Sequence, residues 1–313
     1  KIDVNDAVWI ADLLAHGLIR ASFVPETRIQ HLRALTRTRK QLVRARAQHM
    51  QRLQKTLEDA NLKIASVVSD IKGQNGRAIL GAILAGETDP VQLVAVTNGR
   101  LRASQHTLVE ALRGRITAHH RFLLQLHVDQ IVALETALAA VDKEVGAALD
   151  PVRDGTALLK TIPGVSDVVA QVIVSEIGVD MARFPTAGHL LSWAGLCPRN
   201  DESAGKRRST RLRPGAPWLK TTLVQAAWGG ARSKGTYLQA QFLRLKSRRG
   251  PKKAIIAVAA SILTAAYCML RDGVAYRDLG GDYFDSRDKS QAARRLVRRP
   301  RDLGFAVELK EVA

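Results

Sequence analysis

The chain opens with two aspartates at a spacing that suits two different roles. Asp3 and Asp6 stand three positions apart, and Gly17 follows the apolar run that comes after them. In one role they begin a helix: Asp3 is the N-cap, Asp6 lies beside the positive helix end, and Gly17 stops the helix. In the other role the two carboxylates point from one helical face towards a divalent metal ion. The spacing alone favours the cap.

A loop rich in serine and arginine offers a different chemistry. Residues 195–215 read GLCPRNDESAGKRRSTRLRPG and hold two serines, Ser203 and Ser209. The basic residues around them are Lys206, Arg207, Arg208, Arg211 and Arg213. A serine there can attack a phosphodiester, while guanidinium groups bind the phosphate bidentately and stabilise the charge added in the transition state. Most serines in polar loops have no catalytic role, so composition alone leaves both interpretations open.

A glycine turn between two apolar helical segments suggests a phosphate contact. The stretch LLKTIPGVSDVVAQVIVSEIG, with Gly164 in its turn, is similar to a helix-hairpin-helix unit. In such a unit, the backbone N–H groups of the turn and of the following helix bind phosphate, and glycine permits the turn. Ser166 stands where a second glycine is usual. A purely structural turn is therefore an equal alternative.

The charge balance indicates a polyanionic partner, most simply nucleic acid. The formal net charge is +19 and the sequence pI is near 10.6, an imbalance that an enzyme of small neutral metabolites does not need. Aromatic residues make up only 4% of the chain, so phosphate contacts should dominate over base stacking. A further basic cluster is expected to bind nucleic acid through Arg248, Arg249, Lys252 and Lys253.

The cysteines and the apolar segments favour a protein of the reducing cytoplasm. Cys197 and Cys268 are far apart, and neither has a second Cys or a His at metal-binding spacing. This spacing suggests neither a disulfide framework nor a zinc site at the cysteines. Residues 254–270 are uncharged, but the run is shorter than the roughly 20 residues that span a membrane. We therefore expect a buried core helix and no membrane partner.

Apolar spacing predicts a mainly α fold with two long helices. One helix is predicted over residues 26–71, and a second helical stretch over 109–149. A compact middle joins them, which suggests an antiparallel hairpin with coiled-coil character. The hairpin is either a scaffold or dimerisation arm or a nucleic-acid contact. Pro151 and Gly155 break the helical pattern and mark a domain boundary near residue 152.

Four segments occur in an order that is typical of one family. They are KIDVNDAVWIADLLAHGLIR at 1–20, TIPGVSDVVAQVIVSEIG at 161–178, GLCPRNDESAGK at 195–206 and RRGPKKAIIAVAASILTAAYCML at 248–270. With these motifs the chain resembles the transposases of insertion sequence family 110, relatives of the Piv/MooV DNA invertases, over nearly its whole length. Four motifs in register are far more specific than any one of them.

The resemblance implies a domain order. Family members have a RuvC-like domain with a DEDD carboxylate set, a helical coiled-coil region and a transposase domain that bears a catalytic serine. The expected domains are the end of a RuvC-like domain at 1–24, the coiled-coil hairpin at 25–151, the transposase domain with the helix-hairpin-helix-like motif at 152–280 and a basic tail at 281–313. On this basis the chain starts inside the RuvC-like domain and is truncated at its N-terminus.

The resemblance also implies a catalytic site. Asp3 and Asp6 fall on the last two acids of the DEDD set, whose first Asp and Glu would lie upstream of this chain. Ser203 falls on the serine of the family's Ser-Gly motif, although Ala204 separates it here from Gly205, so Ser209 remains a second candidate. Four acids holding Mg²⁺ would act with the serine on DNA through a covalent phosphoserine.

The resemblance implies three partners: DNA, a structured non-coding guide RNA, and further copies of the chain in a dimer or tetramer. Guidance by RNA leaves sequence choice to base pairing, while the protein holds backbones and RNA shape. The family function is DNA transposition and recombination. The alternative is a catalytically incomplete remnant that binds nucleic acid without cutting it.

Overall fold

The computed structural model describes most of the chain and shows a mainly α-helical protein, which confirms the predicted fold class. The described residues are 3–19, 23–68, 70–98, 103–198, 201–203, 206–209, 211–287 and 289–307. They divide into two compact units, one formed by residues 1–33 with 148–313 and the other by residues 34–147. Each unit has its own hydrophobic core.

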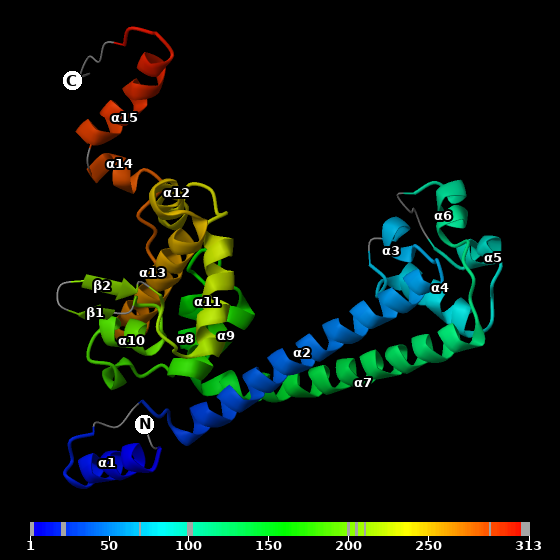
Figure 1. Ribbon diagram of the computed structural model, residues 1–313, viewed down its shortest axis with the longest axis horizontal. Coiled ribbons are helices and arrows are strands. Elements are labelled where there is room, and N and C mark those ends of the chain that lie inside the picture. Colours follow the sequence, from blue (N-terminus) through cyan, green and yellow to red (C-terminus); the bar gives the residue numbers. More distant parts are fainter. Residues whose placement is uncertain are drawn as a thin grey trace. The chain divides into compact units, whose positions relative to one another are not determined.

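The unit formed by residues 1–33 and 148–313 is built around one helix, α13 (Pro251–Asp272) (Figure 1). The helices that pack around it are α8 (Arg153–Leu159), α10 (Ala187–Trp193), α11 (Pro217–Gly230) and α12 (Tyr237–Arg249), and α9 (Asp167–Ile177) packs on α8 and α11. The other elements are α1 (Asp3–Ala15), the 3-10 turns η1 (Asp150–Val152) and η2 (Met181–Arg183), strands β1 (Asp201–Ser203) and β2 (Lys206–Ser209), and helices α14 (Tyr283–Arg287) and α15 (Lys289–Asp302).

Helix α13 is buried because apolar side chains recur along it at intervals of about one turn. Ala254, Val258, Ile262 and Ala266 are completely buried, and Tyr267 donates a hydrogen bond from its hydroxyl to the carbonyl of Phe184. The predicted core helix at 254–270 is confirmed. By length and composition alone, α13 and the stretch that begins at Ala118 are both apolar enough to cross a membrane, and half of the α13 window is buried.

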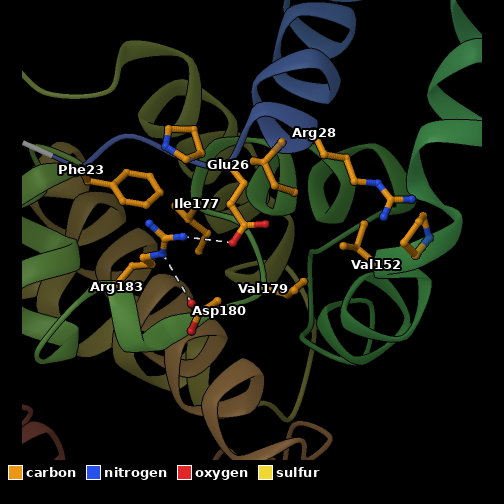
Figure 2. Close-up of a pocket in the computed structure, with 12 residues that line it drawn as sticks. Phe23, Glu26, Arg28, Val152, Ile177, Val179, Asp180 and Arg183 are labelled. Atoms are coloured by element: carbon orange, nitrogen blue, oxygen red, sulfur yellow. Dashed lines mark hydrogen bonds and ion pairs between the residues drawn. The ribbon is translucent and has the colours of Figure 1, made fainter.

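The residues just before α2 (Thr27–Asp59) contact the core of this unit through an ion pair and an aromatic contact. Arg183 forms ion pairs with Glu26 at 3.0 Å and Asp180 at 3.5 Å, around the pocket shown in Figure 2. Phe23 packs on Phe184 with ring centroids 4.6 Å apart. Since Arg183 holds both carboxylates, the pocket does not present a free acidic pair to a metal.

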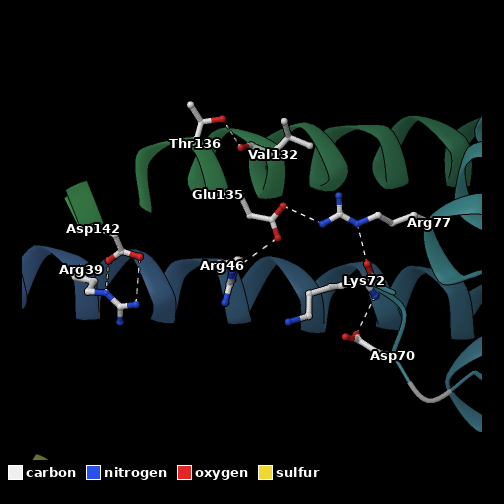
Figure 3. Close-up of polar contacts among 9 residues, drawn as sticks. All are labelled: Arg39, Arg46, Asp70, Lys72, Arg77, Val132, Glu135, Thr136 and Asp142. Carbon is white, nitrogen blue, oxygen red and sulfur yellow. Dashed lines mark hydrogen bonds and ion pairs between the residues drawn. The ribbon is translucent and has the colours of Figure 1, made fainter. Parts of the chain in front are cut away.

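The unit of residues 34–147 is organised by α2 and α7 (Ala118–Leu149), which run antiparallel. Arg39 pairs with Asp142, and Arg46 Nη1 lies 3.7 Å from Glu135 Oε1 (Figure 3). The later residue on α2 therefore pairs with the earlier residue on α7, as antiparallel helices require. Glu135 also accepts a hydrogen bond from Arg77 at 3.1 Å. The four short helices of this unit are α3 (Ile64–Val67), α4 (Gln74–Leu84), α5 (Pro90–Ala95) and α6 (Gln105–Ala111).

The long helix predicted over residues 26–71 is shorter in the structure, because α2 ends at Asp59. Asn61 adopts a left-handed backbone with φ of 60°. The amides of Asn61 and Leu62 donate to the carbonyls of Glu58 and Leu57, which is the hydrogen-bond pattern of a Schellman cap. Apolar spacing continues past the cap because α3 supplies Ile64 and Val67 to the same core.

The second helical stretch, predicted over 109–149, is also interrupted. Helix α6 ends at Ala111 and α7 begins only at Ala118. The connection lies against the end of α2, where the amide of Arg115 donates to the carbonyl of Ala60. A Cβ atom at Gly114 would lie 2.5 Å from that same carbonyl oxygen. Close approach of two backbones therefore breaks the helix.

Candidate functional site

The serine-rich loop contains a small β-hairpin that the sequence did not predict. Strands β1 and β2 pair antiparallel, with Ser203 opposite Lys206 and Asp201 opposite Ser209. An isolated bridge between Pro198 and Leu212 closes the base of the hairpin. The strands therefore place both candidate serines in one two-stranded element. Ala204 and Gly205 lie outside the described residues, as do the side chains of Ser203, Lys206, Arg207 and Arg208.

Ser209 has a local hydrogen bond that occupies its hydroxyl oxygen. The amide of Arg211 donates to Ser209 Oγ at 3.2 Å, and the serine is half-buried. This is the short-range turn contact that serine hydroxyls commonly make. The contact favours a structural role for Ser209, although its hydroxyl proton can still be donated elsewhere.

Two arginines that follow the hairpin are exposed. Arg211 and Arg213 have no hydrogen-bond or ion-pair partner for their guanidinium groups among the described residues. The backbone carbonyl of Arg213 accepts a hydrogen bond from Lys220 Nζ at 3.2 Å, which fixes the chain where α11 begins. Both guanidinium groups are therefore available to an anion.

A second basic group surrounds the junction of α12 and α13. We call Arg248, Arg249, Lys252 and Lys253 the junction cations; all are exposed, and none has a partner among the described residues. The two arginines end α12, where a positive charge is favourable. The two lysines lie in the first turn of α13, where the helix dipole opposes positive charge. An anionic partner would remove that conflict.

Gly164 has a packing role that explains the residue without any ligand. Its φ is +87°, and a Cβ atom there would lie 2.2 Å from the amide nitrogen of Gly230 and 2.3 Å from the carbonyl oxygen of Ala226. The turn between α8 and α9 thus touches the backbone of α11. The structure therefore supports the structural alternative, and a phosphate contact at Gly164 stays a prediction.

Comparison with known proteins matches two parts of the chain to transposase families. Residues 156–242, which include α9 to α11, the β-hairpin and the start of α12, match the family described as Transposase IS116/IS110/IS902. Residues 1–62 match the DEDD transposase family of IS110. Over these two regions the chain matches the IS110 family of transposases. This confirms the resemblance that the sequence motifs indicated.

Two relatives from this comparison support the family. One is an uncharacterized 43.6 kDa protein of insertion element IS110 in Streptomyces coelicolor, 28% identical over 150 residues that make up 47% of this chain and 36% of the relative. The other is the putative transposase y4pF/y4sB of Sinorhizobium fredii, 25% identical over 198 residues, or 60% of this chain and 51% of the relative. The chain thus spans between about a third and a half of the length of these relatives.

The acidic pair of the region that matches the DEDD family lies on α1. The helix begins at Asp3, and the side chain of Asp6 is exposed. Gly17 has φ of +68°, and the amide of Leu18 donates to the carbonyl of Leu13, so the predicted helix stop is confirmed. The side chain of Asp3 lies outside what the structure describes.

The DEDD family suggests a divalent metal, and the donor type agrees with Mg²⁺, which binds carboxylate oxygens. Among the described residues, however, no group of three or more His, Cys, Asp and Glu side chains comes together. The acids that the structure describes therefore do not form a complete metal site.

Sequence analysis missed two further features of the basic surface. Lys246 is exposed on α12, with its Nζ 6.0 Å from the ring centre of Phe242. Trp228 on α11 is 38% exposed and meets the same Phe242 ring edge-on at 5.6 Å. Lys246 lies two residues before the junction cations in the sequence. Nothing in the sequence distinguishes Trp228 from a core tryptophan.

Proposed function

We propose that the chain is part of a DNA transposase that cuts and rejoins DNA phosphodiesters, with Ser203 as the nucleophile. The observation that carries this proposal is the transposase-family match over residues 156–242, a region that contains the β-hairpin with Ser203. Both the exposed arginines after the hairpin and the junction cations come from the same compact unit. They supply charge complementary to a phosphate backbone.

In the proposed reaction the serine oxygen bonds to phosphorus while the bond from phosphorus to a deoxyribose oxygen breaks. The serine loses its proton, and the leaving oxygen takes one up. Arg211 and Arg213, whose guanidinium groups have no partner among the described residues, would stabilise the charge that develops on the phosphate oxygens. A hydroxyl from the second DNA strand then displaces the serine and restores its proton.

We propose Mg²⁺ as the metal, with Asp3 and Asp6 as two of its oxygen ligands. When bound, the ion would stabilise negative charge on the phosphate and on the attacking and leaving oxygens. Two carboxylates one helical turn apart suit an ion that keeps several water ligands. The remaining acids of the DEDD set would complete the site.

A structured guide RNA and a homo-oligomer are part of the same proposal. Exposed cations at two separate places in one unit suit recognition of RNA and DNA by their backbones. Phe122 and Leu126, four residues apart on α7, are 67% and 45% exposed. This apolar face supports pairing with α7 of another copy in a dimer or tetramer. Such a complex would act in the cytoplasm, where the DNA of an insertion element resides.

The test is to trap the covalent DNA adduct. End-labelled DNA carrying the insertion-element junction is incubated with the protein, Mg²⁺ and the transcript encoded beside the element, then separated under denaturing conditions. We expect Ser203→Ala to abolish the adduct and leave RNA affinity unchanged, because the hydroxyl is lost and the basic residues remain. Ser209→Ala is the matched control and should keep the adduct. An adduct that persists in Ser203→Ala and disappears in Ser209→Ala would assign the reaction to Ser209.

A second function, binding of nucleic acid without cleavage, is favoured by one observation. The described residues contain no group of three metal-binding side chains. The same experiment separates the two functions. Retained nucleic-acid binding with no adduct in the unmodified protein, under every divalent ion tried, would support the binding function alone.

A further inference from the structure

Two histidines from different helices face each other inside the 34–147 unit. His49 on α2 and His127 on α7 have their Nδ1 atoms 3.4 Å apart and their ring centroids 5.5 Å apart. Both side chains are half-buried, next to the apolar contacts of the helix pair. The pair has no place in the proposed DNA chemistry, since its unit contains neither the candidate serines nor the acidic pair.

The separation of the two nitrogens suits one metal ion. Zinc binds imidazole nitrogen at about 2.0–2.1 Å in tetrahedral sites, so two histidine nitrogens on the same ion lie about 3.3–3.4 Å apart. The observed 3.4 Å agrees with that geometry. We propose that His49 and His127 bind a zinc ion that clamps α2 to α7.

Zinc binds the neutral form of imidazole, through the lone pair of a ring nitrogen. Without an ion, at most one of the facing Nδ1 atoms can donate to the other, because a neutral imidazole carries one N–H. A shared zinc ion uses the lone pairs of both.

The ligand set determines which ion is selected and how strongly it is bound. No third His, Cys, Asp or Glu joins the pair among the described residues, so water would complete the coordination, as in zinc sites that keep open positions. Imidazole ligands favour zinc over Mg²⁺, which prefers oxygen. Arg52 adds positive charge nearby and keeps the affinity below that of a three-histidine site.

The experiment is a calorimetric titration of the untagged full chain with ZnCl₂, at neutral pH and in excess Mg²⁺. We expect one zinc ion per chain. His49→Gln and His127→Gln should each lower zinc affinity by about tenfold or more, because even the loss of a hydrogen-bond partner to a metal ligand costs that much. The control is His106→Gln, which changes an exposed histidine of the same unit that has no partner among the described residues.

A second measurement needs no variant and so does not depend on the folding of one. Zinc should slow amide hydrogen exchange in the wild-type protein in the peptides around His49 and His127, and EDTA should reverse the effect. Equal zinc affinity in the wild type and both variants, or slowed exchange only elsewhere in the chain, would overturn the proposal.

Discussion

Two sets of basic residues, one in each unit, are used in opposite ways. In the 34–147 unit, Arg39 and Arg46 pair with acids on α7, and Arg77 shares Glu135 (Figure 3). In the other unit the junction cations, Arg211 and Arg213 are exposed without partners among the described residues. The same residue type therefore holds two helices together in one unit and remains available to phosphate in the other. Net charge alone does not distinguish these uses.

The largest expected effect is on nucleic-acid binding by the junction cations. Replacing all four by alanine should make log affinity depend less steeply on log salt, with a slope shallower by about 3 to 4, because each lost phosphate contact contributes about 0.9. The measurement is fluorescence anisotropy with labelled duplex DNA between 50 and 200 mM salt. The matched control, alanine at Arg39, Arg46 and Arg77, should leave the slope unchanged. Equal slopes in the wild type and in both alanine variants would show that the junction cations do not contact phosphate.

The next largest effect is on the stability of the unit formed by residues 1–33 and 148–313. Gly164→Ala should lower the free energy of unfolding by about 3 kcal/mol or more, because the new methyl group would overlap the backbone of α11 and the residue has positive φ. Denaturant unfolding measures the change. Gly235→Ala is the control: its φ is +73° but nothing lies within 4 Å, so only about 1 kcal/mol of backbone strain is expected. Similar losses in both variants would contradict the packing role.

A smaller effect is expected from the paired arginines. Arg39→Ala should lower the free energy of unfolding by about 0.2–1 kcal/mol, since Arg39 and Asp142 are partly exposed and such pairs contribute little. Asp142→Ala should cost a similar amount, and the double variant less than the sum of the two. The measurement is a double-mutant cycle by chemical denaturation. Additive losses would show that the pair contributes no coupling energy.

The smallest effect is a pH dependence confined to the 34–147 unit. The pKa of His127 is lowered in the folded protein, first by burial and then by His49 and Arg52. The unfolded chain therefore binds a proton more readily, and stability should fall as pH drops below about 6.5, the ordinary histidine value. Unfolding of wild type and His127→Gln in EDTA at pH 7.5 and 5.5 measures this. A fall of the same size in both proteins would exclude His127 as the cause.

The sequence by itself determined the helical class, the family and the elements whose causes are local. Apolar spacing locates α13 because buried apolar side chains recur along it about once per turn. Gly17 marks the end of α1 because a left-handed residue is needed there. The transposase motifs could be recognised because they keep their order and spacing along the chain.

The tertiary structure decided the features that depend on distant partners. Helix α2 ends at Asp59 because the backbone beyond it bonds to the connection between α6 and α7. Strands β1 and β2 escaped prediction because they are short and charged, and because each strand forms by pairing with the other. Nothing in the sequence distinguishes the role of Arg39 from that of Arg248. Among the described residues, Arg39 has an acid opposite it on a neighbouring helix and Arg248 does not. An ion pair, a backbone contact and a strand pairing each require a second segment, and folding alone brings that segment into place.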